Sequence, residues 1–389
     1  MSVGRVRIGA AGLAAVAMLA VASAGAPAVA SGGTGGTVHA GTQAAMDAAV
    51  KAGVPGVAAQ VKDGISVWPG TSGVGNLQTR QPRSAFDRYR IGSMTKTFVA
   101  TVLLQLEAEG KIDLDDPVET WLPGVVQGNG NDGRLVSVRQ LLDHTSGLFN
   151  YVMDPEFLEN GFTEKFLEHR YDTYTPEQLV AMAVRHQPLF APGAGWSYSN
   201  TNYVLAGMIV EKVTGRSYAD EIDRRIVKPL GLYGTSVPRT NSSLPQPSSR
   251  AYSKLSLQPQ PGGQVYDVTE LNPSAAGSAG AMISESGDLN RFYSALLGGK
   301  LLPARQLAEM KTTVAVPPGS GAPFTGYGLG LMKFDLSCGT SVWGHGGNIQ
   351  GSASEAVTTA DGKHSLAFNF NGDWAGDTQS VLEAEYCPK

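Results

Sequence analysis

Short apolar runs at both ends of the chain have the length and the flanking turn residues of β-strands. Two runs near the N-terminus meet at Asp63-Gly64, a typical hairpin turn, and two near the C-terminus meet at Asp361-Gly362-Lys363. Helices are predicted over 42–53, before the first strand, and over 378–386, after the last. The predicted strands cover 56–64, 65–70, 340–345, 352–360 and 364–372.

The middle of the chain mostly has the pattern of helices. Ser137 with Gln140 and Thr175 with Gln178 form capping boxes at two helix starts. Apolar residues recur at helical spacing over 202–215 and 286–299, and a Pro/Ser-rich segment over 239–264 is expected to be a surface excursion. The simplest fold class is α/β. One domain over 42–389 takes its α/β part from about 42–95 and 276–389, with a mostly helical insertion over about 96–275.

The N-terminal segment has the three parts of an export signal. Arg5 and Arg7 precede an apolar stretch, and Ala28-Val29-Ala30 has the small-x-small pattern of a cleavage site. We therefore predict a signal peptide over 1–30 and a flexible leader over 31–41, so that the mature protein is secreted without stable membrane association. An uncleaved membrane anchor is the alternative, which the Ala/Gly-rich composition and the cleavage pattern disfavour.

Composition narrows the classes of function. The 389 residues carry a net charge of -4 and no run of Lys or Arg, so the basic surface of a nucleic-acid-binding protein is missing. The two cysteines, Cys338 and Cys387, lie in a chain with an export signal, and a disulfide between them is the default expectation. Two buried free thiols are the alternative.

Several common motifs are absent or lack their context. The segment 128–133 matches G-x-G-x-x-G, but it follows no clear strand and is expected to be a loop rather than a dinucleotide site. No serine lies in G-x-S-x-G, and neither H-E-x-x-H nor C-x-x-C occurs. An α/β-hydrolase nucleophile elbow and the usual zinc spacings are therefore not supported.

Ser93 and Lys96 form the one S-x-x-K pattern in the sequence. Phe98, Val102 and Leu106 follow at intervals of four residues and predict a helix with one buried face. Residues three apart lie on neighbouring turns, so the serine and the lysine point the same way. A lysine in a dry cleft can lose its proton and serve as a base for a serine nucleophile. An ordinary helix start with a solvated lysine is the alternative.

Two further segments could complete such a site. Tyr198 and Asn200 lie in a Pro/Gly-rich loop, where the tyrosine could relay a proton. His345, Gly346 and Gly347 end a predicted strand, and glycine there lets a substrate backbone approach the strand edge. Taken singly, each segment could equally be a capped turn or a glycine-rich bend.

Together, S-x-x-K, Y-x-N and H-x-G in this order resemble the serine penicillin-recognising enzymes, in particular the class C β-lactamase and DD-peptidase branch. The segments 141–148, 198–215, 278–289 and 327–331 are also similar to that family. The segment 335–339, paired with a late cysteine, looks like the secreted soluble D-alanyl-D-alanine carboxypeptidases. The resemblance covers about 42–387 and implies a β-lactamase/transpeptidase-like fold, with an antiparallel sheet flanked by helices.

The resemblance also implies roles for individual residues. Ser93 would form an acyl-enzyme, and Lys96 and Tyr198 would share the proton transfer, with the identity of the base left open. His345 would stabilise Tyr198 or hold substrate. Asn200 would orient Lys96 or bind the acyl amide of the substrate, and Gly346 and Gly347 would line the substrate's path. The backbone N–H groups of Ser93 and Asn348 would form the oxyanion hole. His144 is expected to be structural. The family needs no metal or organic cofactor, and a monomer acting on a small peptide or β-lactam-like substrate is expected.

The substrate-binding residues depart from the carboxypeptidase pattern. Met332 stands where those enzymes have the arginine that pairs with the terminal carboxylate, Lys333 lies beside it, and Ala275 replaces a cleft tryptophan. A D-alanyl-D-alanine carboxypeptidase is the first interpretation. The alternatives are an esterase, a D-amino-acid amidase or peptidase, or a β-lactamase on the same scaffold, and a catalytically inactive binding protein.

Overall fold

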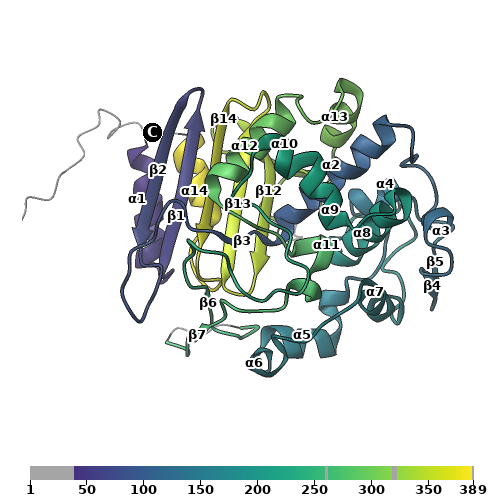
Figure 1. The fold of residues 1–389 in the computed structure, drawn as a ribbon, viewed down its shortest axis with the longest axis horizontal. Coiled ribbons are helices and arrows are strands. Elements are labelled where there is room, and N and C mark those ends of the chain that lie inside the picture. The colour runs from purple at the N-terminus through teal and green to yellow at the C-terminus, as the bar shows by residue number, and fades with distance from the viewer. Residues whose placement is uncertain (1–38, 259–261, 318–321, 388–389) are drawn as a thin grey trace, which may run out of the picture.

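The two ends of the chain form one antiparallel sheet (Figure 1). The computed structural model describes residues 39–258, 262–317 and 322–387, and within them the main sheet has the strand order β2-β1-β14-β13-β12-β11-β10-β9. β1 pairs with β14 from Val57 opposite Phe370 to Asp63 opposite His364, which confirms the predicted α/β class with an antiparallel sheet. The strands are β1 Gly56–Asp63, β2 Ser66–Gly73, β9 Val314–Ala315, β10 Gly326–Tyr327, β11 Met332–Asp335, β12 Ser341–Ile349, β13 Ser352–Thr359 and β14 His364–Phe370.

The strand β12 extends four residues beyond the end that the sequence predicted. Gly346 lies opposite Glu355 and Gly347 opposite Ser354 of β13, so the glycines continue the ladder instead of ending it. Glycine is depleted in strands because it packs no side chain and loses much entropy, which is why the pattern placed the end at 345. The added residues lie where the candidate site is built.

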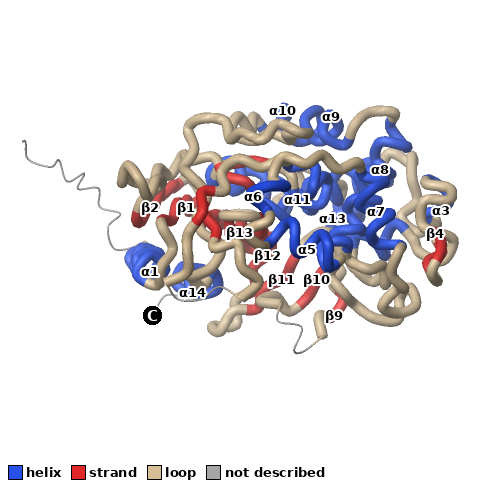
Figure 2. Tube along the Cα trace, turned by 90° about the horizontal axis from the view of Figure 1, so that it is seen from below, coloured by secondary structure: helices blue, strands red, loops and turns tan. Residues whose placement is uncertain are grey.

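One face of the sheet is covered by the first and last helices, α1 Ala40–Lys51 and α14 Thr378–Tyr386 (Figure 2). Met46, Val381 and Leu382 of these helices are buried in one apolar cluster with strand residues such as Phe368. The helix α1 begins at Ala40, so the last two residues of the predicted leader over 31–41 are helical. The predicted signal peptide over 1–30 lies outside the described residues.

The other face of the sheet packs against α12 Ser286–Leu297, and most of the remaining helices lie beside the sheet, on the right of Figure 1. The helix α2, Thr95–Ala108, lies in the centre and stacks Phe98 on Phe292 of α12 at 3.7 Å between ring centres. Its polar residues Thr97 and Thr101 are buried as well, so the single buried face predicted for this helix is wrong. A helix enclosed on all sides by other elements buries its whole circumference.

The insertion predicted over about 96–275 is less helical than expected, because long loops such as 231–251 follow its helices, although helices supply most of its regular structure. Both capping boxes, Ser137 with Gln140 and Thr175 with Gln178, are confirmed. Besides α2 and α12, the α-helices between β2 and β9 are α3 Val118–Trp121, α4 Val138–Leu142, α5 Pro155–Phe162, α6 Phe166–His169, α7 Pro176–Val184, α8 Asn200–Thr214, α9 Tyr218–Ile222, α10 Lys228–Leu230, α11 Gly277–Gly280 and α13 Ala304–Lys311. Small two-stranded ladders join β3 Tyr89–Arg90 to β8 Ile283–Ser284, β4 Gln127–Gly128 to β5 Asn131–Asp132, and β6 Tyr252–Ser253 to β7 Tyr266–Asp267. The G-x-G-x-x-G match over 128–133 was expected to be a loop, but it forms a small hairpin, in which Gly128 of β4 pairs with Asn131 of β5.

Cys338 and Cys387 form the predicted disulfide, with their Cα atoms 5.6 Å apart. The bridge fastens the turn between β11 and β12 to the end of α14, and so holds the C-terminal helix against the strand that carries the glycines. In the part of the chain that the structure describes, no helix has the length and apolar character needed to cross a membrane.

Candidate active site

Ser93 is the middle residue of a short 3-10 turn, Gly92–Met94, that leads directly into α2. Its side chain makes no capping bond to the helix, unlike an ordinary serine at a helix start. Lys96, one turn later, places Nζ 3.0 Å from Ser93 Oγ. The structure therefore brings together the serine and the lysine that the sequence paired.

Lys96 is fully buried and has three oxygen neighbours. Its Nζ lies 2.8 Å from Asn200 Oδ1 and 2.7 Å from the carbonyl oxygen of Ala279, besides the contact with Ser93. Burial lowers the pKa of Lys96 well below its usual value. A neutral amine has two hydrogens and one lone pair. The two acceptors can take the hydrogens, which leaves the lone pair for the hydroxyl proton of Ser93.

Tyr198 lies on the loop before α8, beside this pair. Lys96 Nζ is 4.8 Å from the centre of its ring, and its buried hydroxyl has no hydrogen-bond partner among the described residues. Burial raises the pKa of Tyr198, and the nearby Ser93, although it lacks hydrogen-bond geometry, lowers it in part. The net direction is upward, so the phenol is neutral at ordinary pH and can donate a proton.

His144 supports the loop that carries Tyr198. Its ring packs 4.3 Å from the Tyr198 ring, and its Nδ1 accepts from Ser199 N at 3.2 Å and from Asn202 Nδ2 at 3.1 Å. The residue is buried and has a φ of 65°, a conformation that residues other than glycine rarely adopt. These contacts agree with the structural role expected for it.

The turn that carries Ser93 lies directly against the β12 backbone. A methyl group on Gly347 would lie 1.9 Å from the carbonyl oxygen of Ile91 and 3.2 Å from Ser93 N. One on Gly92, whose φ is +50°, would lie 2.9 Å from Asn348 N. Glycine is required on both sides of this contact, and it brings the backbone N–H groups of Ser93 and Asn348 close together.

The side chain of His345 is turned away from the cleft. Its Nε2 lies 2.9 Å from Tyr327 Oη, and its Nδ1 lies 2.5 Å from the carbonyl oxygen of Gly346. Burial lowers the pKa of His345 to about 3, an effect to which Lys96 adds whenever it is protonated and which the carbonyl of Gly346 opposes, so the ring is neutral. Its ring centre lies 6.4 Å from that of Tyr198. Tyr327, its hydrogen-bond partner, gave no chemical signal in the sequence.

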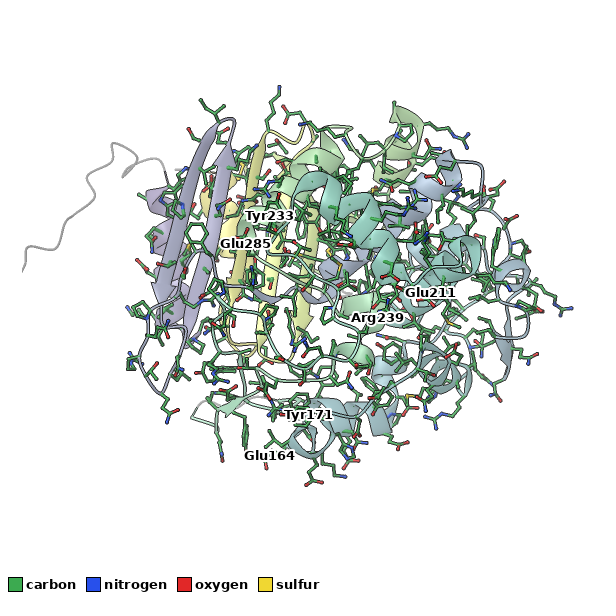
Figure 3. The ribbon with its side chains drawn as sticks, viewed as in Figure 1. Glu164, Tyr171, Glu211, Tyr233, Arg239 and Glu285 are labelled. Carbon is green, nitrogen blue, oxygen red and sulfur yellow. A yellow bond between two sulfur atoms is a disulfide. The ribbon has the colours of Figure 1, made fainter. Side chains whose placement is uncertain are left out.

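A cleft of about 510 Å³ opens beside Ser93 and Asn200. Ring contacts divide its aromatic residues into two groups: Tyr151, Phe157 and Tyr174 in one, and Trp196 with Phe324 in the other. Figure 3 labels Glu164 and Tyr171 at its lower edge. Glu164 lies just before α6 and Tyr171 just after it. The cleft has the size and the apolar character of a site for a small organic ligand. The aromatic residues that line it are Tyr151, Phe157, Phe162, Phe166, Tyr174, Trp196, Tyr198 and Phe324.

Met332 lies in the wall of this cleft, where its sulfur accepts from Gly346 N at 3.5 Å. Lys333 alternates to the other side of β11 and pairs with Asp335, with 2.9 Å between Nζ and Oδ1. Among the described residues that line the cleft, His169 is the one whose side chain can carry a positive charge, and it pairs with Asp172 at 2.7 Å. Near Met332 the cleft wall instead contains a carboxyl group, that of Glu355.

Sequence reasoning missed Glu355. It lies in the middle of an ordinary strand pattern, ten residues after His345, with no neighbouring acidic or basic residue to draw attention to it. The pairing of β13 with β12 places Glu355 opposite Gly346. The sequence could have predicted this pairing only if it had also predicted that β12 extends beyond residue 345.

Comparison with known proteins finds a family model and solved structures that are similar to this chain. A family model described as Beta-lactamase matches residues 42–380. A solved D-stereospecific amidohydrolase from Streptomyces sp. is 61% identical, with a TM-score of 0.85 over 90% of this chain and 99% of that chain. A D-amino acid amidase from Ochrobactrum anthropi SV3, solved in complex with D-phenylalanine, is 29% identical, with a TM-score of 0.77 over 89% of this chain and 98% of that chain.

A curated relative has a penicillin-binding name. Penicillin-binding protein 4* of Bacillus subtilis (strain 168) is 34% identical over 168 residues, which is 42% of this chain and 34% of that protein. The chain thus matches about a third of the length of that curated relative.

Proposed function

Because the chain belongs to the Beta-lactamase family, a family of serine hydrolases, we propose that it hydrolyses amides of D-amino acids through an acyl-enzyme on Ser93. This proposal rests on the composition of the cleft wall at Met332. The described residues there offer the thioether of Met332 and the carboxyl group of Glu355 in place of a cation. A carboxypeptidase must hold a free terminal carboxylate, and an unpaired charge in such a cleft costs several kcal/mol. An amide substrate has no such carboxylate to pair.

In the first step, Ser93 Oγ attacks the carbonyl carbon of the substrate while the lone pair of Lys96 Nζ takes the hydroxyl proton. Asn200 and the carbonyl of Ala279 hold the amine in place for this transfer. The negative oxygen of the tetrahedral intermediate is stabilised by the backbone N–H groups of Ser93 and Asn348.

In the second step, the C–N bond breaks and the leaving amine takes the proton of the Tyr198 hydroxyl. Lys96 returns its proton to Tyr198, which restores both groups. A water molecule then attacks the acyl ester and gives a proton to Lys96. The bond between the acyl carbon and Ser93 Oγ breaks, Tyr198 donates its proton to Oγ and takes the proton of Lys96 in return, and the D-amino acid leaves free Ser93. The low pKa of Lys96 and the high pKa of Tyr198 support this division between base and acid.

His345 is proposed to act by position rather than by proton transfer. Its ring is neutral and bonded to Tyr327, so it fixes the packing behind Tyr198. Met332 and Gly346 would contact the substrate, while Gly347 allows the serine turn to approach β12.

The relatives support the same substrate class. The Streptomyces protein is described as a D-stereospecific amidohydrolase and the Ochrobactrum protein as a D-amino acid amidase. The D-alanyl-D-alanine carboxypeptidase activity that the sequence resemblance implied stays a prediction, which the residues at Met332 do not favour. Secretion and a monomeric state also stay predictions.

The test is the release of ammonia from D-phenylalanine amide and L-phenylalanine amide by the wild type and by Ser93→Ala. The proposal expects turnover of the D-amide, little turnover of the L-amide, and none by the variant. Equal turnover of the two enantiomers, or none of either, would contradict it.

A further inference from the structure

Glu355 is a buried carboxyl group in the cleft wall that the proposed mechanism does not use. It lies on β13 opposite Gly346, is 6% exposed, and lines the same cleft as Ser93. A methyl group on Gly346 would lie 2.8 Å from each of its two carboxyl oxygens. The carboxyl group therefore lies directly over the strand along which a substrate would bind.

This carboxyl group is poorly satisfied by the protein. Thr378 Oγ1 donates to Oε1 at the long distance of 3.4 Å, and Oε2 has no hydrogen-bond partner among the described residues. A buried polar oxygen without a partner is costly and is uncommon in folded proteins. It calls for a ligand that supplies the missing donor.

Two other carboxyl groups with raised pKa values show the contrast. Glu211 Oε1 accepts from Tyr218 N at 3.2 Å, and Glu285 Oε1 accepts from Asp288 N at 3.0 Å. Figure 3 labels Glu211 among the helices and Glu285 in front of the sheet. Both have backbone donors and neither lines the cleft, so they need no ligand.

We propose that Glu355 binds a positively charged nitrogen of the substrate, and that this contact selects substrates with an ammonium group near the scissile amide. The inference rests on the proposed function, because it concerns the substrate of the same site. The ammonium could be the α-amino group of a D-amino acid amide or an amine on the leaving group. Both place a cation within a few bonds of the carbonyl that Ser93 attacks.

The surroundings of Glu355 explain why the charge would matter. An ammonium that enters a cleft lined by Trp196, Phe324 and Met332 loses its water, and it needs a carboxylate to offset that loss. Burial raises the pKa of Glu355 to about 8, against a smaller opposing effect of Thr378. A bound ammonium favours the ionised form, so the ion pair forms as the substrate enters.

The test uses substrate pairs that differ in one atom. D-phenylalanine amide and D-phenyllactamide differ at the α-position in an ammonium against a hydroxyl, and the N-(2-aminoethyl) and N-(2-hydroxyethyl) amides of D-phenyllactate differ in the same way in the leaving group. In one of these two pairs the ammonium group would reach Glu355. For that pair, the wild type should prefer the ammonium compound by about ten-fold or more in kcat/KM. Glu355→Gln should reduce that preference by about ten-fold, mainly through KM. Glu211→Gln is the matched control and should keep the wild-type preference.

The first pair tests the α-amino group and the second the leaving group, so the affected pair identifies the source of the ammonium. Preferences that are the same in Glu355→Gln and wild type for both pairs would overturn the proposal.

If no D-aminoacyl compound is hydrolysed, the proposed function fails, and Glu355 is tested separately. Labelling of Ser93 by a fluorophosphonate is then measured with 2-phenylethylamine or 2-phenylethanol as the competing ligand. Protection by the amine that weakens about ten-fold in Glu355→Gln supports the cation site. Equal protection by the amine in wild type and variant contradicts it.

Discussion

Lys96 Nζ lies 3.0 Å from Ser93 Oγ, and its other two polar contacts are both acceptors. No carboxylate contributes to the pKa of Lys96, which burial alone lowers. Burial therefore favours a neutral amine facing the hydroxyl group, which is the arrangement of a base and its nucleophile.

The first prediction concerns this pair. Ser93→Ala should abolish labelling by a fluorophosphonate or a fluorescent penicillin, and Lys96→Gln should lower kcat by about 10²–10⁴-fold, because the proton acceptor is lost. Since the lowered pKa keeps the amine neutral, kcat/KM of the wild type should fall only when the pH drops to that pKa. Undiminished labelling of Ser93→Ala would refute the assignment, and a pH profile without an acidic limb would refute the role of Lys96.

The second prediction concerns the close contact between β12 and the serine turn. In Gly347→Ala the new methyl group would meet the carbonyl oxygen of Ile91 at 1.9 Å, so the turn must move away from the strand. A displacement of this size should reduce kcat/KM by about a hundred-fold. Gly161→Ala is the control, since its methyl group would make contacts of 3.7 Å and longer, and it should keep its thermal stability. A Gly347→Ala variant with normal kinetics would show that this approach is not needed.

The third prediction concerns the disulfide between Cys338 and Cys387, which are 49 residues apart. Loop-closure entropy for that separation corresponds to about 4 kcal/mol of unfolding free energy. The oxidised protein, unfolded without reductant, should show no thiol in a titration, and the double Cys→Ser variant should unfold at a lower denaturant concentration. Two titratable thiols would be inconsistent with the bridge.

The fourth prediction concerns stability and pH. Burial raises the pKa of Glu355 from 4.5 to about 8, so between these values the folded protein holds a proton that the unfolded chain has lost. The contribution of this group to the free energy of unfolding is full below pH 4.5, declines as the pH rises, and levels off above about pH 8. The decline amounts to up to about 5 kcal/mol. Denaturant unfolding across this range should show a smaller decline in Glu355→Gln, and identical curves would contradict the raised pKa.

Local patterns in the sequence predicted much of this structure. The predicted range of α14 matches the observed helix, and the first two strands and both capping boxes were found because turn and cap residues act over a few positions. The S-x-x-K, Y-x-N and H-x-G residues were identified by spacing and resemblance, and the fold brings Ser93, Lys96 and Asn200 into contact.

What the sequence could not give depends on long-range register. The side chain of His345 turns to Tyr327, and the extension of β12 through Gly346 and Gly347 is held by pairing with β13. Glu355 enters the cleft only through that pairing. Each of these features is decided by a neighbour that is distant in sequence, and neither periodicity nor motif spacing records it.

We expect that the cleft does not select a substrate with a free carboxylate. The most direct measurement compares kcat/KM for a D-alanyl-D-alanine peptide with that for the same peptide carrying a C-terminal amide. The wild type should cleave the amide as fast as the free acid or faster, because Met332 offers no cation and Lys333 faces away. Met332→Arg combined with Glu355→Gln should reverse the preference, since the new arginine could then bind the carboxylate without being neutralised by Glu355. A wild type that strongly prefers the free acid, and loses that preference in Lys333→Ala, would show that Lys333 selects the carboxylate after all.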